Sequence, residues 1–141
     1  MQRSARDSYL ATEVLTATPQ KLQLMLIEAA IRFAERARAD WQADDDEQAA
    51  DALGRAQQVV GELLAGLNRQ LDSPLVKKIA SVYLFVFRNL MEASCQRDEK
   101  KLDDALRVLQ VERETWCQVC RKLGGESPPD APATTGLSLE A

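Results

Sequence analysis

Residues 49–67 read AADALGRAQQVVGELLAGL, and this stretch decides the fold class. Its apolar positions recur at alternating intervals of four and three residues, the period of an α-helix that buries one narrow stripe. Three glycines weaken this helix only modestly. A stripe of this length suits a helical bundle, so we expect an all-α protein. The members of the stripe are Ala49, Leu53, Ala56, Val60, Leu63 and Leu67.

Four helices are predicted, because the starts and the last stop have recognisable signals. Thr18-Pro19 and Ser73-Pro74 each place a capping hydroxyl before a proline that suits the first helical position. The acidic run 44–47 and Asp98 offer carboxylates that can cap the other two starts. Gly124-Gly125 ends the last helix. The expected helices cover residues 19–41, 46–71, 74–97 and 99–123.

Short connections between these helices favour an antiparallel up-down four-helix bundle over residues 18–125. The chain has 141 residues, a usual size for one domain. Residues 1–17 are too few to form an independent unit, and we expect them to pack on the bundle as a cap. Residues 126–141 are rich in residues that break helices and poor in residues that form a core, so we expect a disordered tail.

Charge and hydropathy limit the kinds of partner. Lysine and arginine total 18 against 22 aspartates and glutamates, and basic residues never form a run longer than two. The resulting net charge of -4 disfavours nucleic acid as a partner. No stretch reaches the ~20 apolar residues that cross a bilayer, and the first residues lack the apolar core of a signal peptide. We therefore expect a cytoplasmic protein without membrane insertion.

The sequence offers no candidate catalytic, cofactor or metal site. Histidine is absent, which removes the commonest general base near neutral pH and the commonest metal ligand. Cys117-x-x-Cys120 mimics a zinc or redox motif, but it lacks the further ligands of a zinc site and the βαβ context of a redox pair. With Cys95 the cysteines number three, and reduced thiols are expected. We predict a non-enzymatic protein with no cofactor and no metal.

The most informative stretch for function is 79–91, because its apolar residues do not keep to one stripe. The seam that a bundle helix needs comprises Val76, Ile79, Tyr83, Val86 and Leu90. On one flank of this seam lie Val82 and Phe85, and on the other lie Leu84, Phe87 and Met91. One alternative to a binding surface is enclosure of this helix by its neighbours and by the N-terminal segment. Another, for residues 82–87 in isolation, is a buried β-strand.

The first predicted helix also carries two apolar stripes. Its seam is expected at Leu22, Leu26, Ala29, Phe33 and Ala37, and an adjoining face carries Leu24, Ile27, Ile31 and Ala34. A four-helix bundle of this size cannot easily bury both stripes of both helices. We therefore predict a groove for an amphipathic partner helix. Its candidate residues are Leu24, Ile27, Ile31, Val82, Leu84, Phe85 and Phe87.

The segment ahead of the first helix has apolar side chains of its own to bury. It is expected to cover the groove when no partner is bound, which adds Tyr9, Leu10, Val14 and Leu15 to the candidate partner-binding residues. A permanent cap on one end of the bundle is the alternative.

The order of residues near the N-terminus resembles a known family. The stretch Tyr9-Leu10-x-Thr12-Glu13-Val14-Leu15-Thr16-Ala17-x-Pro19-Gln20-Lys21-Leu22-x-Leu24-Met25-Leu26 is similar to the opening signature of the flagellar export chaperone family FliS. Later positions of the chain also match the family, among them Val82-Tyr83, Arg88-x-Leu90-x-Glu92-Ala93, Arg97-Asp98, Leu102 and Trp116. The resemblance extends from about Tyr9 to Trp116.

The resemblance implies a function that the residues alone do not give. Members of this family are antiparallel helical bundles that bind the C-terminal region of flagellin in the cytoplasm. They prevent its premature polymerisation and help deliver it to the flagellar type III export gate. The expected partner is therefore flagellin, with the export gate as a second one, and the protein is expected as a monomer or weak homodimer. A structural or regulatory bundle that dimerises or binds a different helix is the alternative.

Overall fold

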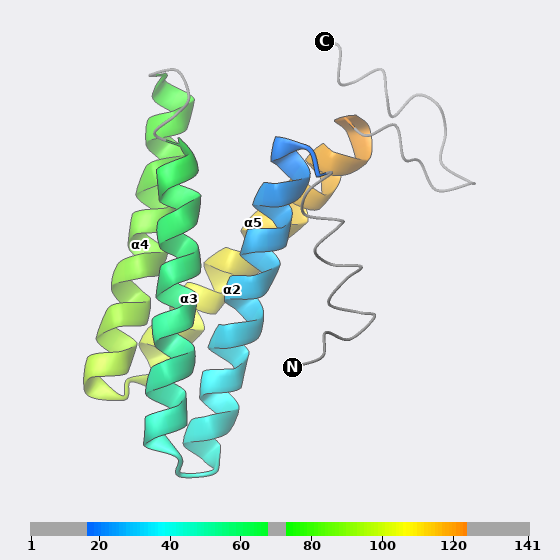
Figure 1. Ribbon diagram of the computed structural model, residues 1–141. Helices are drawn as coiled ribbons and strands as arrows, with labels where there is room; N and C mark the ends of the chain where they lie inside the picture. Colours follow the sequence, from blue (N-terminus) through cyan, green and yellow to red (C-terminus); the bar gives the residue numbers. More distant parts are fainter. Residues whose placement is uncertain (1–16, 68–72, 124–141) are drawn as a thin grey trace, which may run out of the picture. The chain divides into compact units, whose positions relative to one another are not determined.

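The computed structural model describes residues 17–67 and 73–123, which form four α-helices and, within those ranges, no strand (Figure 1). The helices are α2 (Pro19–Gln42), α3 (Asp46–Leu67), α4 (Pro74–Gln96) and α5 (Glu99–Leu123). The predicted all-α class is confirmed, and the alternative of a strand at residues 82–87 is wrong. Expectations for residues 1–16, 68–72 and 124–141, including the N-terminal cap, the turn after α3 and the disordered tail, lie outside the described residues.

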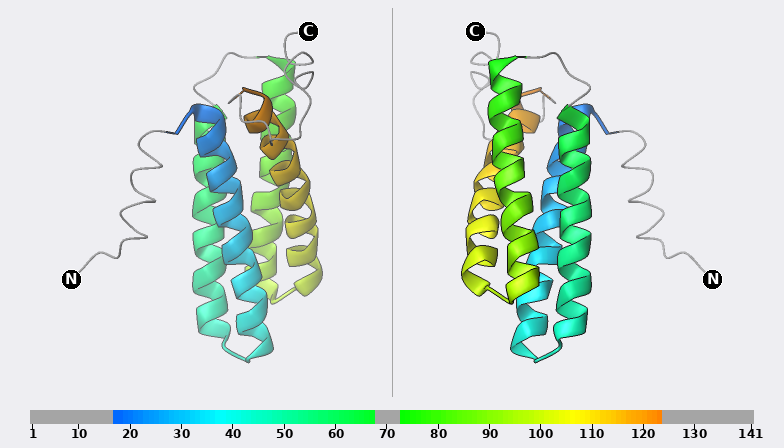
Figure 2. Two further views of the ribbon diagram at one scale, coloured as in Figure 1. Left: turned by 90° about the vertical axis from the view of Figure 1, so that its right-hand side faces the viewer. Right: turned by 90° about the vertical axis from the view of Figure 1, so that its left-hand side faces the viewer.

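Contacts divide the chain into two units. The larger unit, Leu26–Thr115, contains most of all four helices, which alternate in direction as an up-down bundle (Figure 2). In it α3 and α4 lie side by side (Figure 1). The smaller unit contains residues 17–25 and 116–123, which are the start of α2 and the end of α5. The predicted up-down arrangement of four helices is confirmed.

Every helix start is capped by the side chain of the residue that precedes the helix, as the sequence predicts. These bonds satisfy backbone N–H groups that have no partner inside the helix. They run from the Lys21 N–H to Thr18 Oγ1 (3.1 Å), from the Gln48 N–H to Asp45 Oδ1 (3.1 Å), from the Val76 N–H to Ser73 Oγ (3.2 Å), and from the Lys100 and Lys101 N–H groups to Asp98 Oδ1 (3.0 and 3.3 Å).

Two turns inside the larger unit depend on a left-handed residue. Arg97 has φ 50° and ends α4, and the N–H of Asp98 then donates to the carbonyl of Ala93 at 3.1 Å. Asp44, with φ 59°, plays the corresponding part between α2 and α3. A left-handed residue at the end of a helix lets the N–H groups beyond it donate to helix carbonyls that otherwise lack a partner. It also reverses the chain within a few residues. The connections are therefore short, and neighbouring helices are antiparallel.

The core of the bundle is lined by the stripes of α3, α4 and α5. All six positions of the predicted α3 stripe are buried, so that stripe is confirmed. In α4 the seam residues Tyr83, Val86 and Leu90 are buried, whereas Val76 and Ile79 are half-buried. The buried residues of α5 are Leu102, Ala105, Leu106 and Leu109.

The predicted seam of α2 is wrong at four of its five positions, and only Ala37 is buried. Leu22 is exposed, and Leu26, Ala29 and Phe33 are only half-buried. The stripe that lies in the core is the adjoining one, which includes three alanines with no exposed surface. Because alanine is small, this stripe lets α2 approach its neighbours closely while the bulky Phe33 stays at the margin. The buried residues of α2 are Leu24, Ile27, Ala30, Ile31, Ala34, Ala37 and Trp41.

Candidate partner-binding surface

The outer surface of α4 exposes more large apolar side chains than any other described helix. The side chains of Phe85, Leu84 and Met91 are 45%, 41% and 41% exposed, and Leu75 in the first turn is 66% exposed. Soluble proteins rarely leave such side chains together on one helix unless the surface binds something. The other described helices do not enclose these residues. The N-terminal segment, which the same alternative included, lies outside the described residues.

The exposed apolar residues of α4 form two flanks on either side of its buried seam. Consecutive helical residues are ~100° apart, so Phe85 lies on one side of Val86 and Leu84 lies toward the other. We call Val82 and Phe85 the Phe85 flank, and Leu84, Phe87 and Met91 the Leu84 flank. Val82 and Phe87 are half-buried, so each flank reaches from the core margin to the outer surface.

Two side chains of α4 hydrogen-bond to carbonyls four residues earlier in the same helix. The buried Asn89 donates through Nδ2 to the carbonyl of Phe85 at 2.8 Å. Ser81 Oγ donates to the carbonyl of Lys77 at 3.1 Å. The amide of Asn89 is thereby satisfied at the edge of the core, where an unpaired polar group would be costly. The Phe85 flank therefore belongs to a continuous helix.

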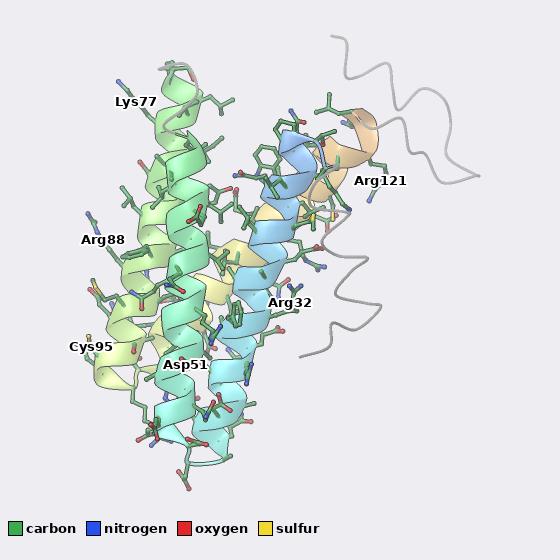
Figure 3. The ribbon with its side chains drawn as sticks, viewed as in Figure 1. Arg32, Asp51, Lys77, Arg88, Cys95 and Arg121 are labelled. Atoms are coloured by element: carbon green, nitrogen blue, oxygen red, sulfur yellow. The ribbon has the colours of Figure 1, made fainter. Side chains whose placement is uncertain are left out.

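The charges on α4 are mostly positive. Figure 3 shows Lys77 and Arg88 extending from the outer side of this helix, and Lys78 is also exposed. The one acidic residue of α4 is Glu92, whose Oε1 lies 2.9 Å from Lys101 Nζ on α5. Hydrogen bonding to Glu92 and its negative charge raise the pKa of Lys101 above its ordinary value. Glu92 is thus already paired with a cation.

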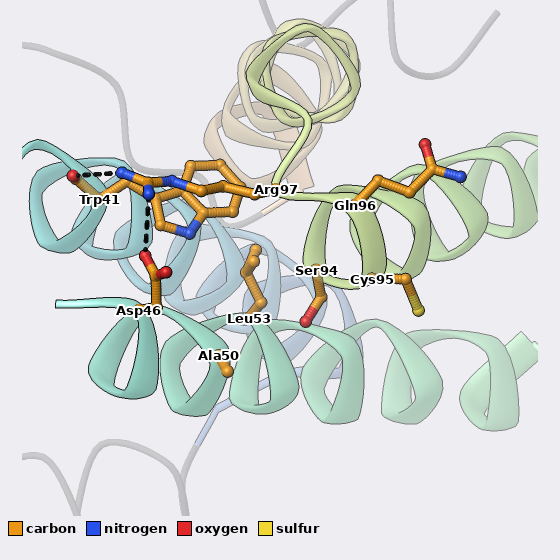
Figure 4. A pocket seen from close by; sticks show the side chains of 8 residues that line it. All are labelled: Trp41, Asp46, Ala50, Leu53, Ser94, Cys95, Gln96 and Arg97. Carbon is orange, nitrogen blue, oxygen red and sulfur yellow. Dashed lines mark hydrogen bonds and ion pairs between the residues drawn. The ribbon is translucent and has the colours of Figure 1, made fainter. Parts of the chain in front are cut away.

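A pocket of about 330 Å³ lies near one end of the larger unit, where α3 passes the end of α4 (Figure 4). Arg97 occupies its rim and donates to the Trp41 carbonyl at 2.8 Å. The same guanidinium lies 3.3 Å from Asp46 Oδ1 and 3.5 Å from Asp44 Oδ1. The hydrogen bond and the ion pairs of Arg97 join the α2–α3 turn to the α4–α5 turn. We therefore interpret Arg97 as a structural residue.

A second, more open pocket of about 420 Å³ lies between α2 and α5. Arg113 of α5 stands there at a position where the heptad favours an apolar residue, and it is exposed. Nearby along the same two helices, Arg38 hydrogen-bonds Asp103. The lining of this pocket between α2 and α5 is therefore mostly polar. The pocket is lined by Glu28, Ile31, Arg32, Glu35, Gln110 and Arg113.

The predicted partner-binding residues fall into three groups. Val82, Leu84, Phe85 and Phe87 are all on α4, divided between its two flanks. Leu24, Ile27 and Ile31 are instead buried, with Ile27 fully enclosed, so the interpretation of their stripe as spare surface is wrong for this conformation. The remaining four, Tyr9, Leu10, Val14 and Leu15, lie outside the described residues.

Sequence reasoning missed one exposed apolar residue of α4 and the two pockets described above. Leu75 follows the helix-starting proline and lies off the seam, which was the available signal. No pattern in the sequence indicates the two pockets, because they depend on how turns and helices distant in sequence come together.

Within residues 17–67 and 73–123, no group of three or more potential ligands is arranged to hold a metal ion. Of the three cysteines, Cys95 is exposed, and Cys117 and Cys120 are half-buried. None of the described helices has an apolar stretch long enough to span a membrane.

Comparison with known proteins gives a consistent picture. The sequence model of a family described as "Flagellar protein FliS" matches residues 1–123. A relative from Bacillus subtilis (strain 168), named "Flagellar secretion chaperone FliS", is 30% identical over 111 residues, which cover 79% of this chain and 82% of the relative. Proteins with the same name from Salmonella typhimurium and Campylobacter jejuni are 26% and 24% identical, over 77% and 82% of this chain and 82% and 90% of their own lengths.

Proposed function

The chain belongs to the FliS family of flagellar secretion chaperones, and on that premise we propose that it binds the C-terminal helical region of flagellin. It acts in the cytoplasm, where it keeps flagellin from polymerising prematurely. It then assists delivery of flagellin to the flagellar type III export apparatus. This function makes and breaks no covalent bond, so the proposal does not include an enzymatic activity.

The observation that carries this proposal is the exposed apolar surface of α4. A partner helix with apolar residues at positions i, i+3, i+4 and i+7 can lay that stripe along a helical surface of this kind. Covering the exposed part of a side chain such as Phe85 contributes on the order of 1 kcal/mol to the free energy of binding. Several side chains covered together therefore give a useful affinity after the entropic cost of association.

The buried stripe of α2 has a different part in this proposal. Leu24, Ile27 and Ile31 reach a client only if the start of α2 moves, whereas Phe85 and Leu84 are available without any movement. We therefore assign the first contact to α4. Any contribution from Tyr9, Leu10, Val14 and Leu15 comes from exchange of the N-terminal segment with the client.

The test is direct binding of the purified full-length protein to a C-terminal fragment of flagellin. Size-exclusion chromatography with light scattering, together with isothermal titration calorimetry, should give a stoichiometric complex. Absence of a complex at micromolar concentrations would overturn the proposal. If the protein alone instead shows a mass that rises with concentration through the α4 surface, a self-associating structural or regulatory bundle becomes the better explanation.

A further inference from the structure

We propose that the Phe85 flank selects a partner helix whose apolar stripe is bordered by acidic side chains. This inference rests on the proposed chaperone function and adds the chemical character of the segment that α4 binds. It is carried by the coincidence of exposed apolar residues and unpaired cations on one side of α4.

The first step is the position of two cations. Lys78 stands four residues before Val82, and Arg88 stands three residues after Phe85, so each is about one helical turn from an apolar residue of the flank. Both are exposed. Among the described residues neither forms an ion pair, whereas the exposed Arg55, Lys100 and Arg107 each have an acidic neighbour on their own helix.

The second step is the absence of a competing anion on α4. Glu92 is the only acidic residue among Pro74–Gln96, and its carboxylate is 2.9 Å from Lys101 Nζ. The helix carries three basic residues and one acidic residue, a net charge of +2, in a chain whose net charge is -4. The exposed apolar residues of α4 thus lie on the most positively charged of the four described helices.

The third step is the character of the neighbouring helix. In Asp46–Leu67 four acidic residues stand against one basic residue, a net charge of -3, and none of its large apolar side chains is exposed. An acidic partner helix would be attracted to α4 and repelled by α3. Charge therefore fixes the position of the partner, while apolar contact supplies most of the affinity.

The probes are two designed amphipathic peptides with the same leucine stripe, one carrying glutamates and the other lysines along its borders. We expect the full-length protein to bind the glutamate peptide about tenfold more tightly than the lysine peptide at low salt. The preference should shrink between about 0.05 M and about 0.5 M salt, because exposed charges are screened.

Charge-reversal variants of the protein provide a more specific test of this preference. Combining Lys78→Glu with Arg88→Glu should invert the preference, so that the lysine peptide binds more tightly. The matched control combines Arg36→Glu with Lys100→Glu, which changes the net charge equally on the exposed surfaces of α2 and α5, and it should keep the preference for glutamate. Inversion also shows that the variant remains folded, and circular dichroism provides a second check.

Several outcomes separate this inference from the proposed function. If the flagellin fragment binds the wild type and the charge-reversed variant equally and neither designed peptide is preferred, the chaperone function stands and the inference is wrong. If the glutamate peptide is preferred but the flagellin fragment does not bind, the inference stands for another acidic partner and the proposed function is wrong. Binding to vesicles of anionic phospholipid, with no peptide preference, would assign the surface to a membrane and overturn the inference.

Discussion

Helices α3 and α4 lie side by side and have similar lengths, but they use their apolar residues differently. In α3 the large side chains lie in or beside the buried stripe, and glycines and charged residues face outward. In α4 the stripe is buried from Tyr83 onward, yet Leu84, Phe85 and Met91 remain exposed. The comparison shows that a bundle helix needs one narrow stripe for stability. Apolar residues beyond that stripe are available for binding.

The largest expected effect tests whether the buried stripe carries the stability. Leu63→Ala in α3 removes a fully buried side chain and should lower the free energy of unfolding by about 3 kcal/mol. Leu84→Ala in α4 removes a side chain that is already partly exposed. It should lower the free energy of unfolding by less than about 1 kcal/mol. Urea unfolding monitored by circular dichroism measures both. Equal losses would mean that α4 buries the Leu84 flank in solution.

The next effect tests whether the exposed apolar surface binds the client. Phe85→Glu should weaken the complex with the flagellin fragment by at least about tenfold, because a charge would be placed against an apolar stripe. Val111→Glu is the control, since Val111 is 60% exposed on α5, away from the α4 surface. Calorimetric titration compares the two variants.

The outcome that contradicts this prediction is also specific. If Phe85→Glu unfolds the protein while its remaining folded fraction binds normally, Phe85 belongs to the core. If Val111→Glu weakens binding equally, the binding surface is not confined to α4.

The smallest effect concerns the outer side of α3. A Cβ added at Gly54 would meet no atom within 4 Å, so alanine fits without strain. Gly54→Ala should stabilise the protein by about 0.5–1 kcal/mol, because it lowers the conformational entropy of the unfolded chain and favours helix. Affinity for the flagellin fragment should be unchanged. Weaker binding on this substitution would place part of the client on α3 and reduce the contrast between the two helices.

The success of sequence reasoning differed between helices for a physical reason. In α3 one stripe alone satisfies helical spacing, so its burial followed from the sequence. In α2 two stripes satisfy the spacing, and local spacing alone does not say whether Leu22, Leu26 and Phe33 or their neighbours face the core. The core contains Leu24, Ile27 and Ile31 together with small alanines, which let the helices pack closely.

The candidate site was predicted only in part for the same reason. The surplus of apolar residues on α4 could be counted in the sequence, and Phe85 and Leu84 are exposed as that surplus suggested. Burial of Ile27 and Ile31 depended on which face of α2 turned inward. The contacts of Arg97 with Trp41 and Asp46 join residues ~50 positions apart, and no local pattern indicates them.

The sequence by itself determined the four helices, their caps, the antiparallel order and the family, because capping, heptad spacing and short turns act between residues close in the chain. The tertiary structure alone decided which stripe of α2 is core, how Glu92 is paired, and which flanks of α4 stay exposed. These outcomes depend on the shapes and charges of side chains brought together from different helices. For α4 the result is an apolar surface with two unpaired cations, which local spacing predicted only as a surplus of apolar residues.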